Sequence, residues 1–197
     1  MKKRLRRIFG ERGAAIVEMA IVLPLLIVLV FGIVEYGLLF KEKLTIASAA
    51  TSAARTGATM GTRAEADIAI LRALEAGLYD QVDASVLISV EIFKANPVTG
   101  AKTTFLNRYI YNPAVSCKWV PCPDPTPGPA VYGSPSDWGN PSVRDTTLDP
   151  GGGGLDVLGI EVVYHHSAVT GMIPGIERDL TELARVRLEP DVFGTGP

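Results

Sequence analysis

Side chains that usually carry catalysis or bind metals are scarce in this chain of 197 residues, which has only two histidines and two cysteines. His165 and His166 are neighbours. On a strand they would point to opposite faces and could not easily share one ion. The P-loop, the G-x-S-x-G and H-E-x-x-H motifs and the dinucleotide fingerprint are all absent. We therefore expect no enzyme activity, no catalytic residue, no metal site and no cofactor.

The two cysteines, Cys117 and Cys122, stand in "CKWVPC". They lack the C-x-x-C spacing of a redox motif, and a zinc site needs more ligands than this pair and the distant histidines. In a domain outside the cytoplasm, a close and even pair predicts a disulfide. The closed loop is short, so we expect a stabilisation at the low end of the usual range.

Charge is absent from residues 19–34, a run that is almost entirely apolar. With its apolar flanks the run reaches the length of about 20 residues that crosses a bilayer core of about 30 Å. Basic residues are concentrated in residues 1–13, whereas the chain beyond residue 40 has a net negative charge. Because Lys and Arg beside a span stay cytoplasmic, we predict a single pass through the inner membrane with the C-terminal domain outside. The acidic remainder argues against nucleic acid as a partner.

Three interpretations fit this segment. A cleaved secretory signal has the basic start, but its apolar region is usually 7–15 residues long, which is shorter than the run here. An uncleaved anchor explains the run but gives no reason for Glu18 at its start. Glu35 follows the run at the outer interface and could simply reach water. In the third interpretation the chain is cut after Gly13, which makes Glu18 the fifth residue. The new amine at Ala14 and a Glu18 carboxylate could then pair between neighbouring helices.

Motifs at both ends of the run resemble those of one known family. The stretch "RGAAIVEMAIVLPLLIVLVFGIVEYG" and the later "AARTGA" are similar to the TadE-like family of pilus-assembly proteins, relatives of type IV pilins and pseudopilins. That family has a G-A-x-x-V-E opening, an L-P step, an F-G-I-x-E-x-G exit and a later A-A-R. The matching residues here are Gly13, Ala14, Val17, Glu18, Leu23, Pro24, Phe31, Gly32, Ile33, Glu35, Gly37, Ala53, Ala54 and Arg55.

The resemblance implies a minor pseudopilin that acts in the assembly of a Tad-type (Flp) pilus. Its implied partners are other pilins and pseudopilins, met through the N-terminal helix, together with a prepilin peptidase and membrane proteins of the assembly machinery. The peptidase would cut between Gly13 and Ala14, and Glu18, Pro24 and Glu35 would set the register between subunits. The protein could then enter the fibre or stay in the membrane. The alternative is a signal-anchored binding module outside the cytoplasm, without a role in a pilus.

The remaining pattern predicts an α+β fold. We divide the chain into a basic leader 1–13, a membrane helix 14–40 that continues towards residue 60, and an extracytoplasmic domain 41–197. A second helix is expected over 62–80, with Thr62 and Glu65 as a capping box. Alternating apolar residues predict an antiparallel sheet of about four strands, packed on the helices. The expected strands are 85–94, 103–111, 155–166 and 180–190.

A loop rich in Pro and Gly, residues 112–154, interrupts this pattern. It is long for a connection inside a compact domain, which is typical of functional or partly disordered segments. Its aromatic residues Trp119, Tyr132 and Trp138 could cover the domain or form an exposed binding surface, and we favour coverage. The binding-module alternative would depend on this loop.

Overall fold

The computed structural model describes residues 2–123, 141–148, 154–171, 173 and 175–190, with side chains from Gly13 onward. Contacts divide the chain into two compact units. We call Met1–Phe40 with Ser167–Glu177 the helix unit. Lys41–His166 with Arg178–Pro197 form the sheet unit. The first helix, α1, contributes to both, and each unit is described by itself.

Helix α1 extends over Lys2–Met60. The membrane helix was expected to continue into the domain, and it does so without a break. Pro24 lies inside the helix, where its ring costs one backbone hydrogen bond. Thr45 and Thr51 in the second half donate their hydroxyls to the carbonyls four residues earlier, at 2.9 and 2.8 Å. These hydroxyls are therefore satisfied within the helix.

The second helix, α2, spans Ala66–Leu78 and lies within the predicted range. The predicted capping box is wrong, because Glu65 occupies the N-cap position and makes no side-chain cap hydrogen bond. Gly77 lets α2 approach α1 closely: a Cβ at this position would lie 2.8 Å from the Cβ of Ala49. The small residues of α1 thus face the protein's own core. Ala49, Ala50, Ala53 and Ala54 are all buried there.

Five antiparallel strands form one sheet in the order β3-β2-β1-β4-β5. The α+β class is confirmed, and a fifth strand, β3, adds to the expected four. This strand consists only of Trp119–Val120 and comes from the Pro/Gly-rich loop. The other bounds are β1 Leu87–Ala95, β2 Lys102–Tyr111, β4 Val157–His166 and β5 Arg178–Arg187. Two short 3-10 helices are Ala84–Val86 and Pro141–Val143.

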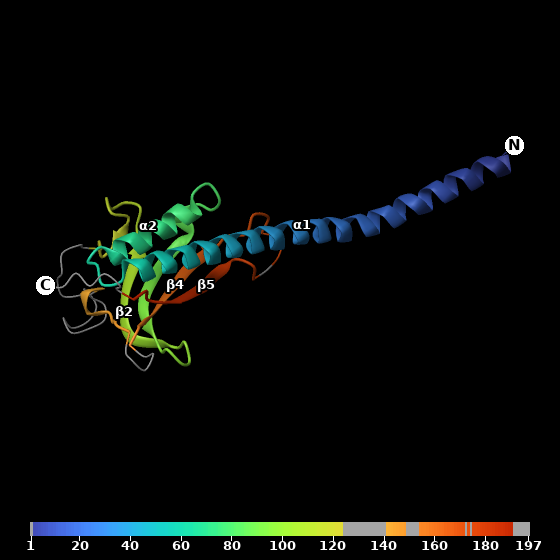
Figure 1. The fold of residues 1–197 in the computed structure, drawn as a ribbon. Coiled ribbons are helices and arrows are strands. Elements are labelled where there is room, and N and C mark those ends of the chain that lie inside the picture. The colour runs from blue at the N-terminus through green and yellow to red at the C-terminus, as the bar shows by residue number, and fades with distance from the viewer. Residues whose placement is uncertain (1, 124–140, 149–153, 172, 174, 191–197) are drawn as a thin grey trace. The chain divides into compact units, whose positions relative to one another are not determined.

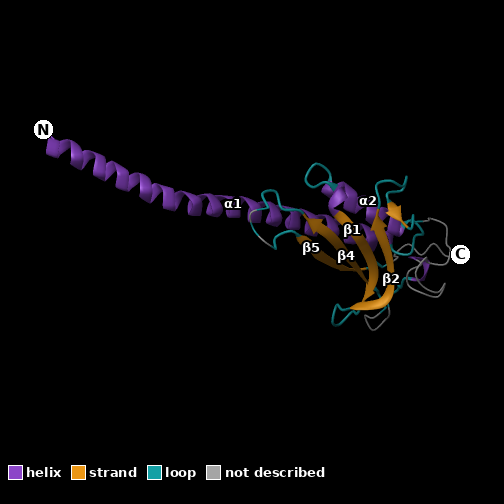
Figure 2. Ribbon diagram, turned by 180° about the vertical axis from the view of Figure 1, so that it is seen from behind, coloured by secondary structure: helices purple, strands orange, loops and turns teal. Residues whose placement is uncertain are grey.

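Helix α2 and the C-terminal part of α1 cover one face of this sheet (Figures 1 and 2). Strands β1 and β4 are central, and Ile92 stands opposite Ile160 in their register. Both side chains are fully buried in one cluster with Ile46 of α1 and Ile70 of α2. Burial of large apolar side chains on this scale, about 1.5–3 kcal/mol each, is the main stabilisation of the sheet unit.

Candidate functional site on helix α1

Every side chain of α1 from residue 13 to residue 31 is exposed. Large apolar residues take part on all sides, for example Ile16, Ile21 and Leu25 at about 70% exposure. A helix that is apolar all round belongs in a protein core or in a membrane. Here no protein covers it, and within the described residues it is the one helix long and apolar enough to cross a membrane. Its length and composition indicate a single membrane anchor.

The candidate cleavage site and the first glutamate lie on this exposed segment. Gly13, Ala14 and Glu18 are all exposed, and a Cβ at Gly13 would meet no atom within 4 Å. Within the part of the chain that the structure describes, Glu18 makes no hydrogen bond or ion pair. Its carboxylate is therefore available to a group outside the molecule. The role of Glu18 and Pro24 in subunit register stays a prediction.

Glu35 has a different environment from the one expected. It does not reach water, because only 1% of it is exposed. Its two carboxylate oxygens accept the backbone N–H of Thr170, each at 3.3 Å, across 135 positions of sequence. Both residues belong to the helix unit. Glu35 thus binds the loop between β4 and β5, a contact that no local pattern in the sequence indicated.

The rest of the exit motif divides between two faces of the helix. Gly32 lies on the same face as Glu35, and the Cδ1 of Ile173 is 3.6 Å from where a Cβ of Gly32 would be. Phe31 and Gly37 are exposed, and nothing lies within 4 Å of a Cβ at Gly37. Arg55 is an exposed side chain further along α1, in the sheet unit. The motif therefore includes residues that pack against the loop between β4 and β5 and residues that are exposed.

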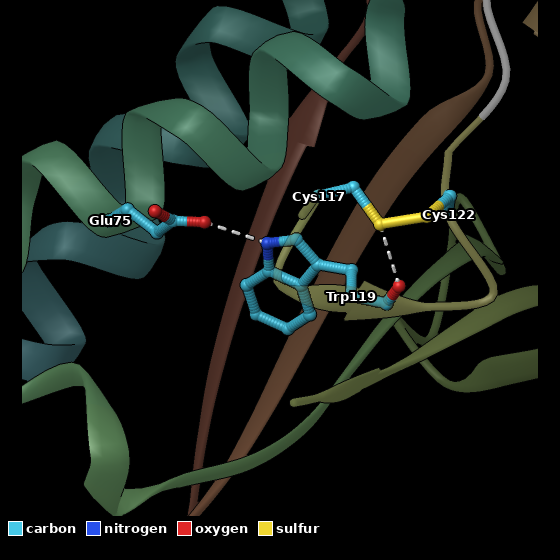
Figure 3. The surroundings of a disulfide bond; sticks show 4 residues. All are labelled: Glu75, Cys117, Trp119 and Cys122. Atoms are coloured by element: carbon cyan, nitrogen blue, oxygen red, sulfur yellow. Dashed lines mark hydrogen bonds between the residues drawn. A yellow bond between two sulfur atoms is a disulfide. The ribbon is translucent and has the colours of Figure 1, made fainter. Parts of the chain in front are cut away.

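The predicted disulfide between Cys117 and Cys122 is present, with Cα atoms 5.9 Å apart (Figure 3). The turn between the cysteines presents Trp119, whose indole N–H donates to Oε1 of Glu75 on α2 at 2.7 Å. Trp119 is 2% exposed and packs edge-on against Tyr111, with ring centroids 5.2 Å apart. Coverage of the domain is thereby confirmed for Trp119. Tyr132 and Trp138 lie outside the described residues.

A buried polar cluster, which the sequence did not reveal, ties another part of the same loop to the core. Asp67 of α2 accepts hydrogen bonds from Asn107 Nδ2 at 2.7 Å and from the Tyr109 hydroxyl at 2.8 Å. It also pairs with Arg144, whose side chain is fully buried. Burial raises the pKa of the Tyr109 hydroxyl, and the neighbouring Asp67 charge raises it further. The cluster fixes the 141–148 segment rather than forming an open site.

The two histidines point apart, as predicted. His165 Nδ1 lies 2.7 Å from Asp179 on β5, on the more exposed side of the strand. His166 is buried, and its Nδ1 contacts Glu42 of α1. Among the described side chains, no group of three or more His, Cys, Asp or Glu could hold a metal ion. These pairs join strand to strand and strand to helix.

The molecule thus combines an α+β domain with one apolar N-terminal helix that carries an unpaired glutamate. Residues 13–55 match the family model described as TadE-like protein. The match covers the apolar segment, both glutamates and Arg55, and ends inside α1. No curated protein and no solved structure matches the chain.

Proposed function

We propose that this protein is a membrane-anchored minor pseudopilin of the TadE-like type, which acts in assembly of a Tad/Flp pilus and has no enzymatic role. One observation carries the proposal. The segment that matches the family is exposed over residues 13–31 and holds Glu18 without a partner, so its binding surface faces lipid or neighbouring helices. The orientation is N-terminus inside, with the domain 41–197 outside the inner membrane. The other partners are a prepilin peptidase and assembly proteins of the membrane.

The role of Glu18 follows from the cost of its charge. An ionised carboxylate at the start of an apolar helix is expensive unless it is paired. Cleavage after Gly13 would create an ammonium at Ala14, four residues away on the same helix. A neighbouring subunit can then match the ammonium of one chain with the Glu18 carboxylate of the next, which offsets both desolvation costs and fixes the axial register.

The test is the N-terminal residue of the protein purified from membranes, with and without a co-expressed prepilin peptidase. We expect Met1 without the peptidase and Ala14 with it. The matched control is Gly13→Leu, which should block cleavage. Because a Cβ at Gly13 has no atom within 4 Å, loss of cleavage there reports recognition rather than folding. Intact Met1 in all samples would contradict processing.

A second test separates assembly from insertion. Glu18→Ala should leave the protein in the membrane but reduce its co-purification with pilins and the number of pili. Glu18→Gln, which keeps the shape and loses the charge, should fail in the same way if charge pairing sets the register. Normal pili in both variants would refute the register role.

The binding-module alternative would need aromatic residues of loop 112–154 to be available. Trp119 is buried and bonded to Glu75, so it cannot contact a ligand without leaving the core. That arrangement favours the pseudopilin proposal.

A further inference from the structure

The loop between β4 and β5, residues 167–177, has an unusual composition for a surface connection. No charged side chain occurs from Ser167 to Ile176. Connections on a protein surface are usually polar, because they are solvated. Here Val169 is 70% exposed, Ile173 is half-buried and Ile176 is buried. The loop therefore offers apolar surface at a place where water would be the ordinary neighbour.

The loop packs against α1 at the end of the apolar run, and both belong to the helix unit (Figure 1). Ile173 reaches Gly32, with Cδ1 3.6 Å from the Cβ position there. Gly32 lies two residues before Val34, the last residue of the uncharged run, which is about 3 Å of helix rise. If the run marks the hydrocarbon region, the loop reaches its outer boundary.

A loop at that depth must satisfy its backbone polar groups without water. The buried Glu35 carboxylate meets this need in part, because both oxygens accept the N–H of Thr170. Gly171 and Gly175 have positive φ angles of 63° and 80°, a backbone conformation that lets the loop turn back on itself. The second glutamate of the motif thus accepts a backbone N–H of the apolar loop, which leaves one polar group fewer to be solvated at the membrane boundary.

We propose that loop 167–177 enters the outer interface of the bilayer beside α1, with Val169 and Ile173 in contact with lipid and Glu35 holding the loop to the helix. The partner is a lipid surface, because Val28, four residues before Gly32 on the same face of α1, is 55% exposed, so the apolar loop adjoins exposed apolar helix surface. This inference rests on the membrane anchoring proposed above for α1. It gives the protein a second, interfacial contact with the membrane.

The test places an environment-sensitive fluorophore on single cysteines in the full chain. The native cysteines form a disulfide and do not compete for the label. Val169→Cys reports the loop and Ile27→Cys reports the span. Val98→Cys is the aqueous control, because Val98 is 91% exposed in the β1–β2 turn of the sheet unit. The labelled proteins are reconstituted in vesicles of phosphatidylcholine and phosphatidylglycerol, with or without lipids that carry a nitroxide quencher.

We expect the label at Val169 to emit at a shorter wavelength than the label at Val98. Nitroxide lipids should quench the Val169 label about as strongly as the Ile27 label and leave the Val98 label unquenched. Adding Glu35→Ala should move the Val169 signal towards that of Val98 and leave Ile27 unchanged. A Val169 label that behaves like Val98 while Ile27 is quenched would overturn the loop proposal and leave the anchor standing. A blue-shifted but unquenched Val169 would indicate protein contact instead of lipid and would also overturn it. An unquenched Ile27 would refute the anchor and the loop proposal together.

Discussion

Trp119 donates its indole N–H to Glu75 at 2.7 Å and so joins the disulfide turn after β2 to helix α2. The Trp119 side chain is buried, and the neighbouring residue Lys118 forms an ion pair with the same Glu75 carboxylate at 3.0 Å. This part of the predicted loop 112–154 is therefore packed in the domain.

Replacing Trp119 by Phe should lower the free energy of unfolding by about 1.5–3 kcal/mol. The change keeps an aromatic ring in the core but removes the hydrogen bond to Glu75, and a bond to a charged group contributes about 1.5–3 kcal/mol. Chemical denaturation in detergent, followed by circular dichroism, measures the effect. Val98→Ala, at an exposed turn, is the control and should change nothing. No loss for Trp119→Phe would show that the bond contributes no net stability.

Reduction of the Cys117–Cys122 disulfide should cost about 2 kcal/mol, the value that loop-closure entropy gives for such a short loop. The cysteines are separated by only five positions. We expect the same loss in the double variant Cys117→Ser/Cys122→Ser, and no effect of reductant on that variant. A loss of unfolding free energy well above about 2 kcal/mol would mean that the disulfide also holds Trp119 in place.

Breaking the buried pair between Asp67 and Arg144 should destabilise the protein strongly, by about 3–5 kcal/mol for Arg144→Ala. The guanidinium is fully buried, and its removal leaves the Asp67 carboxylate without a countercharge. The double variant Asp67→Leu/Arg144→Ala should lose less than the sum of the two single changes, because no unpaired charge remains. A loss in the double variant equal to the sum of the two single losses would rule out coupling between the two residues.

Stability should decline above about pH 10. Burial raises the pKa of Tyr109 and raises the pKa of Tyr164 to about 12, from an ordinary value of 10.0, with the charges of Glu182 and Glu42 adding to the second shift. Between pH 10 and 12 the unfolded chain loses protons that the folded protein retains. The unfolded state is therefore favoured as the pH rises, by about 1.4 kcal/mol per pH unit for each proton.

Denaturation curves between pH 8 and 11.5 measure this decline. The variants Tyr109→Phe and Tyr164→Phe should each make it shallower, although the first also removes the hydrogen bond to Asp67. A flat profile for the parent protein would contradict the raised pKa values. An unchanged slope in both variants would assign the decline to other groups.

The periodic elements could be predicted from the sequence because their signals are local. The apolar run predicts a helix, and the alternation in β1 and β4 predicts strands. Each of these signals lies within a few helical turns or strand positions. The contacts that pin the loops are long-range. Thr170 lies 135 positions from Glu35, and Arg144 lies 77 positions from Asp67. No short pattern pairs such residues, so the sequence indicated an exposed Glu35 and gave no sign of the buried cluster.

Helix α1 continues without a break from the apolar segment into the core, where Ile46 and five buried alanines lie. Proteases need an extended stretch of chain, and this junction offers only helix. A cut beyond Ile46 would remove part of the core, so shedding of an intact domain requires cleavage in the few helical residues before it. A soluble form of the domain designed for crystallography should therefore begin at about residue 41, the first residue of the sheet unit.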